Sequence, residues 1–435
     1  MQYEEAVAYI DETPKFTKKH SLEHTKNALR RLGDPQKDFR VIHVAGTNGK
    51  GSTCAFLASM LREQGYRCGL FTSPHLVEIT ERFLIDEEEI SREVFRDAFE
   101  RVLALSKELE AEGEGHPTYF EMLFLIGMLI FSEAKVSYVI LETGLGGRLD
   151  ATTAVEDPVA CVITSISLDH MQYLGNTVPE IAGEKAGIMV PGVPVVYDGN
   201  DPEAASVMRT HADELGCPWF EIKREDTRIV NRTKDGIDFS VPEFGYGEEV
   251  FHIPFIAEYQ VMNAALAVTT AWVIRDELEL SVEAVGRGLS NTRWPGRMET
   301  VLAGVIVDGA HNDDGVAKFI ETAEHFQEEF PVTLLFSAVD DKDYRGMIAE
   351  ICGKLRLTHV VTTQVGGYRQ VPAGELAQIF RENGVSAVEA CPDPEEAFRM
   401  AYRNRNKEGF LFCVGSLYLV GIIKALIGRD DYDRL

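Results

Sequence analysis

The sequence contains few cysteines, and none of them is spaced for metal binding or for a disulfide framework. Seven cysteines are spread over 435 residues without a CxxC pair, so neither a zinc ribbon nor a disulfide-stabilised domain is indicated. This usage fits buried thiols in a reducing compartment, and we expect a cytoplasmic protein. The amino terminus, MQYEEAVAYIDETPKF, is acidic and amphipathic, unlike a signal peptide.

Positive charge is scarce relative to negative charge. Lys and Arg total 43 against 70 Asp and Glu, which gives a formal net charge of −27. Such a surface repels nucleic acid and anionic lipid, so we expect neither a nucleic-acid partner nor a membrane. Small anionic ligands are not excluded, because cations or backbone amides can reverse the local field inside a cleft.

The two longest apolar stretches do not have the character of membrane spans. FEMLFLIGMLIF, residues 120–131, is too short and contains Glu121, which favours a core helix. Residues 409–428 are long enough, but Gly415 and Ser416 divide the stretch and Lys424 interrupts its second half. We therefore expect a buried strand, a turn and a helix there.

Short apolar runs alternate with helical patterns from Val41 to about Gly187. The strand-like runs are VIHVAG, CGLFTS, VSYVILE and VACVITSIS, and helical patterns such as CAFLASMLREQG lie between them. Apolar strands separated by helices predict a parallel sheet covered on both faces. Within residues 220–255, FEIKRED, TRIVNRTKDGIDFSV and EEVFHIPF alternate with period two, which predicts a small antiparallel set.

Pro295 and Gly296, in NTRWPGRMET, interrupt regular structure and mark the expected domain boundary. Beyond them the alternation of strands and helices restarts with GVIVDGAHN, VTLLFSAVDD, HVVTTQ, SAVEA and FLFCVGS. The predicted fold is α/β. A parallel-sheet domain with a small antiparallel appendage covers residues 1–296, and a C-terminal Rossmann-like α/β domain covers residues 297–435.

A glycine-rich turn follows the first apolar run, in HVAGTNGKGST. It departs from the GxxxxGK[ST] spacing, because Val44 stands where the first glycine belongs and Gly51 separates Lys50 from Ser52. It nevertheless has the parts of a phosphate-binding loop: glycines that let amides turn inward, a lysine for the terminal phosphates, and Ser52 or Thr53 opening a helix whose positive end favours an anion. A plain strand-to-helix turn stays the alternative.

Polar side chains also follow the other strands of the predicted sheet. They are Thr72, Ser73 and His75 after CGLF, Glu142 with Arg148 and Asp150 after VSYVIL, and Asp169 and His170 after CVITSIS. Ligands in open α/β sheets bind outside the carboxyl ends of the strands. Hydroxyl, carboxylate and imidazole groups beside a phosphate loop predict a magnesium site. Taken singly, each residue is more often a solvated or structural one.

Taken together, these segments resemble a known enzyme family. HVAGTNGKGST, TSPHL, ETGLGGRLDAT, ISLDH, EKAGI, WPGRME and DGAHN, between about residues 43 and 312, resemble the motifs of the folylpolyglutamate synthase and dihydrofolate synthase family in their order. This family belongs to the Mur ligase superfamily of ATP-dependent amide-forming ligases, and GTNGKGS is its own version of the phosphate loop. The tail VGSLYLVG is also family-like.

The resemblance implies an activity and a division of labour between the domains. Residues 1–296 would form the ATP-binding domain, with the phosphate loop, and residues 297–435 the glutamate-ligase domain. ATP would phosphorylate a carboxylate of (tetrahydro)folate, and the amine of L-glutamate would displace phosphate from the acyl phosphate. Whether dihydropteroate is also converted to dihydrofolate stays open. We expect a monomer whose partners are these small molecules.

The resemblance also assigns roles to residues at matching positions. The nucleotide would be held by Gly49, Lys50, Gly51, Ser52, Asn263, Arg297 and Asp308. Two Mg²⁺ ions are expected, with Ser73, Glu142, His170 and Lys185, as the carbamate N6-carboxylysine, as ligands. The pterin would contact Arg82, Thr118, Leu149, Asp150 and Ala151. His311 would lie near the incoming glutamate, and the expected catalytic group is Lys50, Lys185, His170 and His311.

Several structural alternatives accompany these assignments. Arg297 could pair with a carboxylate at the domain junction, Asp308 could cap a helix, and Lys185 could form a salt bridge with Glu184 or Asp169. Three positions also depart from the family pattern: Thr153 stands where Asn is common, Ala257 where Gly is usual, and Asn312 lacks its usual following Pro. None of these departures removes a reacting group.

Two other functions fit part of the pattern. A Mur-type cell-wall ligase would normally bind a sugar nucleotide with a first domain, but only about 40 residues precede the phosphate loop. A non-catalytic nucleotide sensor would not need the metal-site set of Ser73, Glu142, His170 and Lys185. The folate ligase is therefore the favoured hypothesis.

Overall fold

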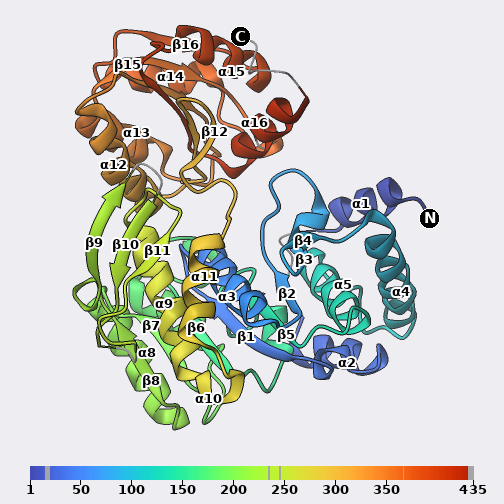
Figure 1. Cartoon of the computed structure of the whole chain (residues 1–435). Helices are drawn as coiled ribbons and strands as arrows, with labels where there is room; N and C mark the ends of the chain where they lie inside the picture. Colours follow the sequence, from blue (N-terminus) through green and yellow to red (C-terminus); the bar gives the residue numbers. More distant parts are fainter. Residues whose placement is uncertain (15–19, 234–235, 244–245, 366, 430–435) are drawn as a thin grey trace. The chain divides into compact units, whose positions relative to one another are not determined.

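The computed structural model describes residues 1–14, 20–233, 236–243, 246–365 and 367–429 (Figure 1). The chain forms two compact units. The first consists of Met1–Pro254 and Gln260–Arg293, and the second of Phe255–Tyr259 and Trp294–Leu435. The chain thus enters the second unit twice, once briefly before the stretch around Pro295. Residues 430–435 of the predicted C-terminal domain lie outside the described residues.

The first unit is built on an eight-stranded sheet in the order β4-β3-β2-β5-β1-β6-β7-β8. Its strands are β1 (Arg40–Ala45), β2 (Cys68–Phe71), β3 (Phe83–Ile85), β4 (Glu88–Glu89), β5 (Tyr138–Glu142), β6 (Ala160–Ile163), β7 (Val195–Asp198) and β8 (Trp219–Ile222). Neighbouring strands are parallel along the sheet order β2-β5-β1-β6-β7-β8. At the other edge, β3 pairs antiparallel with β2, and β4 pairs antiparallel with β3. The predicted parallel sheet is confirmed.

Helices surround this sheet. They are α1 (Tyr3–Glu12), α2 (Leu22–Arg31), α3 (Lys50–Gln64), α4 (Arg92–Ala111), α5 (Tyr119–Glu133), α6 (Met171–Leu174), α7 (Val178–Ala186), α8 (Pro202–Leu215), α9 (Tyr259–Val273), α10 (Arg275–Leu278) and α11 (Val282–Asn291), with short 3₁₀ turns η1 (Pro35–Lys37), η2 (Ile79–Arg82), η3 (Ala151–Ala154) and η4 (Arg224–Asp226). In Figure 1, α3 lies beside α11 and also contacts β1, β2 and β5.

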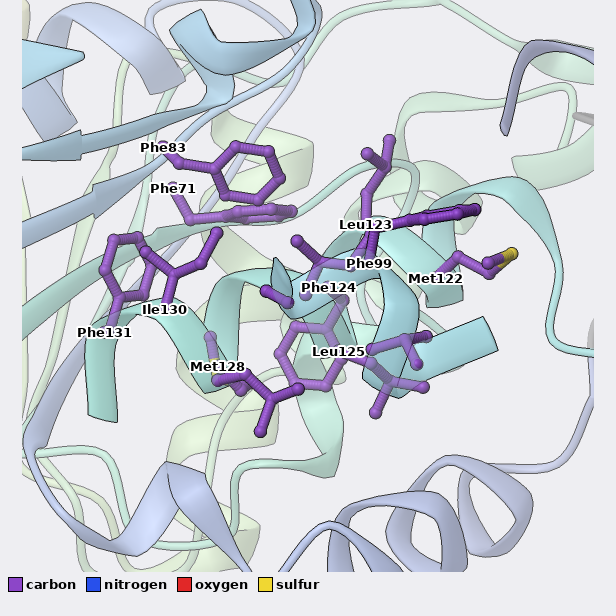
Figure 2. Close-up of a cluster of buried hydrophobic side chains, with 14 of the residues drawn as sticks. Phe71, Phe83, Phe99, Met122, Leu123, Phe124, Leu125, Met128, Ile130 and Phe131 are labelled. Carbon is purple, nitrogen blue, oxygen red and sulfur yellow. The ribbon is translucent and has the colours of Figure 1, made fainter. Parts of the chain in front are cut away.

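The helix predicted at residues 120–131 is a core helix, α5. Its apolar side chains pack with Phe71 of β2, Phe83 of β3 and Phe99 of α4, as Figure 2 shows. Phe124 and Phe131 of α5 are fully buried in this cluster. Burying each aromatic side chain stabilises the fold by about 2 kcal/mol or more, so α5 is held by its tertiary contacts on several faces.

The predicted antiparallel set is partly wrong. β9 (Arg228–Thr233), β10 (Gly236–Ser240) and β11 (Phe251–Ile253) do form a three-stranded antiparallel sheet. The preceding segment FEI belongs instead to β8, which pairs in parallel with β7. As the edge strand of the large sheet, β8 is only partly covered, and a half-exposed strand shows the same alternation of apolar and polar residues as an antiparallel one.

The second unit is the α/β domain that the sequence predicts, with a six-stranded sheet in the order β12-β13-β17-β14-β15-β16. Its strands are β12 (Glu299–Leu302), β13 (Val305–Val307), β14 (Val332–Phe336), β15 (Leu357–Thr362), β16 (Val388–Ala390) and β17 (Phe410–Val414). Its helices are α12 (Asp313–Gln327), α13 (Tyr344–Lys354), α14 (Ala373–Glu382), α15 (Pro394–Asn404) and α16 (Leu417–Arg429), with the 3₁₀ turn η5 (Gly367–Arg369). β12 pairs antiparallel with β13, and the other pairs are parallel.

The apolar stretch at residues 409–428 is the strand β17 followed by the helix α16, as expected. None of the helices in the described part of the chain combines the length and apolar character needed to cross a bilayer. All seven cysteines are free thiols, and six of them are buried while Cys352 is partly exposed.

Candidate active site

The glycine-rich turn connects β1 to α3 and is shaped by close contacts with other segments. Gly46 and Gly49 have φ values of 149° and 89°, which favour glycine. A Cβ atom on Gly46 would lie 1.8 Å from Oγ1 of Thr164, and one on Gly49 would lie 2.2 Å from Oδ1 of Asn263. Both glycines are therefore required by steric fit. α9 thus brings Asn263 to the loop, as the family pattern implies.

The helix after the turn begins at Lys50, two or three residues earlier than the expected opening at Ser52 or Thr53. Gly49 is its N-cap residue, and the amide of Thr53 donates to the Gly49 carbonyl at 2.9 Å. Gly51 and Ser52 therefore lie in the first helical turn, where amides and the helix dipole favour a bound anion. The geometry gives this turn the means to bind phosphate.

The loop is tied to the segment after β6 by hydrogen bonds that sequence reasoning did not anticipate. The amide of Thr47 donates to the Ser165 carbonyl at 2.8 Å, and the Thr164 hydroxyl donates to the Asn48 carbonyl at 2.7 Å. The Thr47 hydroxyl donates to the carbonyl of Ser167 and accepts from its amide. The run of hydroxyl residues in ITSIS was the available signal for this role.

Two lysines from distant segments meet at one carbonyl of the loop. Nζ of Lys50 donates to the carbonyls of Gly46 and Thr47 at 3.2 and 3.1 Å. Nζ of Lys185, from α7, donates to the same Gly46 carbonyl at 2.6 Å. Burial, reinforced by the charge of Lys50, lowers the pKa of Lys185 to about 7. Of the two alternative salt bridges considered for Lys185, the one to Glu184 is not formed: the Glu184 carboxylate pairs with Arg148, and Lys185 donates to the Gly46 carbonyl.

A buried carboxylate stands beside these lysines. Glu142, the last residue of β5, is 3% exposed. One carboxylate oxygen accepts from the amide of Ser73 at 3.0 Å, and the other lies 3.9 Å from Nζ of Lys50. The separation from Lys50 is at the outer limit of an ion pair. The structure thus brings Ser73, Glu142, Lys50 and Lys185 together.

His170 follows β6 and lies beside Asp169. Its φ of 50° places it in the left-handed region at the start of α6, a conformation in which His is several-fold enriched among non-glycine residues. Its amide donates to Oδ1 of Asp169 at 2.7 Å, and its Nε2 lies 3.9 Å from the same oxygen. The segment that ties down the phosphate loop therefore also carries a carboxylate and an imidazole.

The residues expected at the pterin differ in their surroundings. Arg82 is buried, and its guanidinium donates to Nδ1 of His75 at 2.8 Å and to the hydroxyl of Tyr119 at 3.3 Å. Burial lowers the pKa of Arg82. Thr118 is the N-cap of α5, and its hydroxyl accepts from the amide of Glu121. Arg82 thus contacts Tyr119, the residue that follows Thr118.

The loop after β5 is organised by Asp150. One of its carboxylate oxygens accepts from the amides of Gly144 and Leu145, and the other from the amide and hydroxyl of Thr152. Asp150 is buried, as is Ala151, whereas Leu149 is 50% exposed. These bonds give Asp150 a structural reason to be in the loop, and its contact with substrate stays a prediction.

In the second unit, Asp308 is a buried carboxylate with several donors. Its Oδ2 accepts from the amide of Met298 at 2.8 Å and the hydroxyl of Tyr259 at 3.2 Å, and its Oδ1 accepts from the amide of Ala310 at 2.8 Å. Burial raises the pKa of Asp308, and the charge of Arg297 opposes this. The sequence did not indicate the part that Tyr259 plays.

The neighbours of Asp308 settle one structural alternative. Asp308 does not cap α12, because the N-cap is Asn312, which accepts from the amide of Gly315 at 2.8 Å. Nδ1 of His311 lies 2.7 Å from the carbonyl oxygen of Gly309. A Cβ on Gly309 would lie 3.4 Å from a guanidinium nitrogen of Arg297. The motifs WPGRME and DGAHN therefore lie side by side in this unit.

Comparison with known proteins accounts for both units. Residues 44–271 match the Mur ligase middle domain, and residues 296–417 match the glutamate ligase domain of Mur ligases. A dihydrofolate synthase/folylpolyglutamate synthase of Bacillus subtilis is 36% identical over 432 residues, which cover 97% of this chain and 98% of that protein. The chain belongs to the folylpolyglutamate and dihydrofolate synthase family of Mur ligases.

Other members of this family share its length and fold. The folylpolyglutamate synthase of Lacticaseibacillus casei is 30% identical, with 98% of each chain covered. The structure of Mycobacterium tuberculosis folylpolyglutamate synthase complexed with ADP has a TM-score of 0.87 at 27% identity and covers 98% of each chain. Escherichia coli FolC in complex with DHPP and ADP has a TM-score of 0.84 at 28% identity, covering 99% of this chain and 98% of that one.

The family assignment confirms the predicted fold class and the prediction that this chain is an ATP-dependent ligase. It favours the folate ligase over the Mur-type cell-wall enzyme. The departures from the family pattern are locally accommodated. The Thr153 hydroxyl donates to the Gly147 carbonyl at 2.8 Å, Ala257 is fully buried, and α12 begins at Asp313 without the usual proline.

Proposed function

We propose that this folylpolyglutamate synthase family member adds L-glutamate to a reduced folate with ATP as co-substrate. The observation that carries the proposal is the meeting of Lys50, Lys185 and Glu142 at a glycine loop shaped for phosphate. It is supported by the names of full-length relatives and by a structural neighbour described as an FPGS-AMPPCP-folate complex, with a TM-score of 0.82.

The reaction has two steps in which the chain supplies charge and position. A carboxylate oxygen of the folate attacks the γ-phosphorus of ATP, and the bond from that phosphorus to ADP breaks. The amine of glutamate then attacks the acyl carbon, phosphate leaves, and an amide forms with loss of a proton. Two anions must approach each other in the first step, so cationic groups such as Lys50 lower its barrier.

Lys50 has a specific place in this scheme. Its ammonium group donates to two carbonyls of the loop that it would share with the phosphates. These bonds orient the side chain, and the terminal phosphates offer the same ammonium stronger, charge-assisted acceptors. Gly49, Gly51 and Ser52 would supply amides and a hydroxyl, and Asn263 would hold Gly49 in position.

The residues around Glu142 fit a hard divalent cation. A carboxylate and a hydroxyl are ligands that Mg²⁺ accepts, and the amide of Ser73 donates to the buried Glu142 carboxylate, which places the two residues side by side. We propose that Ser73, Glu142 and His170 hold Mg²⁺, with a second ion near Lys185. The metal would neutralise charge between the carboxylate and the γ-phosphate.

Lys185 suits conversion to a carbamate. Only a neutral amine adds to CO₂, with formation of an N–C bond and release of a proton. Since the pKa of Lys185 is lowered to about 7, much of the amine is neutral at physiological pH. The product is an oxygen ligand with negative charge, which would remove the repulsion between a lysine and a metal ion.

The remaining assignments are part of the same proposal. Arg297, Asp308 and Asn263 would contribute to nucleotide binding, and His311 would lie near the glutamate. Asp308 would act chiefly by positioning, because three donors of its own unit already occupy its oxygens. Arg82, Thr118, Leu149, Asp150 and Ala151 would form the folate site, and the active species would be a cytoplasmic monomer.

Dihydropteroate is a second candidate substrate. A relative is named for both activities, and the FolC structure is a complex with DHPP. The test incubates the purified chain with ATP, L-glutamate and either tetrahydrofolate or dihydropteroate, and measures product masses. A glutamate-dependent mass gain with tetrahydrofolate supports the proposal. Absence of any gain with both acceptors, while ATP still binds, contradicts it.

A further inference from the structure

A cluster of metal-ligating side chains lies apart from the phosphate loop. His20, His24 and Glu121 each offer a ligand atom, and these atoms all lie within 4.8 Å of one another. Nδ1 of His20 is 3.0 Å from a carboxylate oxygen of Glu121. The two imidazole rings lie close together and are tilted, with centroids 4.1 Å apart and planes 31° apart. We propose that this cluster is a binding site for a borderline divalent cation of the zinc class.

The donor set indicates which kind of metal would bind. Two imidazole nitrogens and one carboxylate oxygen form a common protein set for Zn²⁺, in which a water molecule fills the fourth position. Imidazole favours zinc and later transition metals over Mg²⁺, which prefers oxygen. Neighbouring ligand atoms around tetrahedral zinc are separated by about 3.3 Å, given bonds of about 2.0–2.1 Å. The separation of His20 from Glu121 already approaches that value.

The surroundings of the cluster hold its members in place. Nε2 of His24 lies 3.4 Å from the carbonyl oxygen of Gly115, and such a contact directs the other ring nitrogen toward a metal. The Glu121 carboxylate also accepts from the amide of Thr118 at 2.7 Å. Glu121 has a side chain that is 9% exposed, whereas that of His20 is 27% exposed. A buried acid with partly exposed histidines leaves an ion a route from solvent.

The site would join parts of the chain that are distant in sequence. His24 lies in α2, His20 immediately precedes that helix, and Glu121 lies in the first turn of α5. A bound ion would therefore fix the start of α5 against α2. That start carries Thr118, so an effect on folate binding would follow as well; this consequence rests on the proposed function, but metal binding does not.

The test uses Co²⁺ as a spectroscopic probe on the full-length chain. The protein is freed of metal with a chelator, supplied with excess Mg²⁺ to occupy oxygen-rich sites, and titrated with Co²⁺. We expect one Co²⁺ per chain with the visible absorption of a four-coordinate ion, displaced by an equivalent of Zn²⁺. His24→Gln should lose this absorption, and Zn²⁺ should raise the unfolding temperature of the unsubstituted chain but not that of the variant.

A neighbouring histidine provides the matched control. Both ring nitrogens of His116 are engaged, Nε2 with the Tyr9 hydroxyl at 2.9 Å and Nδ1 with the Pro117 carbonyl at 2.7 Å. His116→Gln should therefore keep the cobalt spectrum. If His24→Gln does not fold, Glu121→Gln serves instead, because Gln also suits this position of a capping box. Equal Co²⁺ spectra and equal Zn²⁺ stabilisation in all these proteins would overturn the proposal.

Discussion

Glu142, beside the phosphate loop of the first unit, and Asp308, in the second unit, are both buried carboxylates at the end of a strand. Their hydrogen-bond and charged neighbours differ. Glu142 accepts from the amide of Ser73 and lies 3.9 Å from Nζ of Lys50, and the nearby Lys185 is buried with a lowered pKa. Asp308 accepts from three donors of its own unit.

The difference separates two kinds of functional residue. Around the loop, the buried carboxylate of Glu142 lies near Lys50 and Lys185, and the pKa of Lys185 is lowered, which is typical of groups that act on a ligand. Asp308 is compensated by its own unit and determines the conformation of the backbone near Met298 and Ala310. Removing a loop charge should therefore alter chemistry, and removing Asp308 should alter stability.

Lys50→Ala tests the chemical side of the comparison most severely. We expect kcat for ATP-dependent glutamate addition to fall by about 100- to 1,000-fold, the usual cost of losing one stabilising donor in the transition state. The unfolding temperature should stay unchanged. Steady-state kinetics beside thermal unfolding measure this, with Lys107→Ala, an exposed lysine of α4, as control. Wild-type turnover in Lys50→Ala would contradict the proposed role of Lys50 in phosphoryl transfer.

Lys185→Arg separates a carbamate from a simple cation. Arginine keeps the positive charge but forms no stable carbamate, so we expect ATP to bind and ligation to fall by about 100-fold, in the range of lost metal-site groups. Lys185→Ala should regain part of its activity when a short carboxylic acid is added. Isothermal titration and product analysis distinguish these outcomes, and near-normal ligation by Lys185→Arg would rule out the carbamate.

The pH dependence of Lys185 gives a further check on the same prediction. Because its pKa is about 7, the neutral fraction of the amine rises as pH increases through 7. Uptake of ¹³CO₂ by metal-free protein should therefore be several-fold greater at pH 8 than at pH 6, measured by the carbamate signal in ¹³C NMR. Lys185→Arg is the blank for this signal.

Asp308→Ala tests the structural side of the comparison. It leaves the amides of Met298 and Ala310 and the Tyr259 hydroxyl without this acceptor, so we expect a loss of about 2 kcal/mol in the free energy of unfolding. ATP affinity should fall with it. Asp308→Asn, which keeps an acceptor oxygen, should lose less of both. Unfolding by urea measures the change in the free energy of unfolding. Unchanged stability in Asp308→Ala would show that the hydrogen bonds to Asp308 do not stabilise the second unit.

Arg297→Ala should have a smaller and different effect. We expect ATP affinity to fall by about tenfold, as for one charged contact to phosphate, with little change in stability because Arg297 is partly exposed. ATP titration of Arg297→Ala beside Asp308→Asn tells the two roles apart. Unchanged ATP affinity in both variants would contradict a role for Arg297 and Asp308 in nucleotide binding.

Thr164→Val should have the smallest effect. It removes the hydroxyl that donates to the Asn48 carbonyl at 2.7 Å, which costs about 1 kcal/mol. We expect a several-fold rise in the KM for ATP with kcat nearly unchanged. Thr358→Val, which removes a similar bond to the Val332 carbonyl at 2.8 Å, is the matched control and should leave the KM unchanged.

Local patterns in the sequence were sufficient for most of the elements and for the position of the glycine-rich loop between a strand and a helix. The apolar runs became β1, β2, β5 and β6, because residues buried on both faces of a sheet must be apolar throughout. Gly46 and Gly49 located the sharp turn, since their backbone conformation and close contacts favour glycine, and phosphate binding by this loop stays a prediction. Motif order alone was sufficient for the family.

The tertiary structure decided what these patterns could not express. β8 pairs with β7 at the edge of the large sheet, although its alternation of apolar and polar residues is typical of an antiparallel strand. Its pairing depends on the tertiary structure, which leaves the edge of β7 available. Lys185 meets Lys50 at the Gly46 carbonyl from a separate helix, and burial together with the charge of Lys50 lowers the pKa of Lys185 there. His20 and Glu121 are about 100 residues apart, and their contact exists only once α2 packs on α5. Periodicity is encoded locally, whereas proximity and desolvation arise only when distant segments share a core.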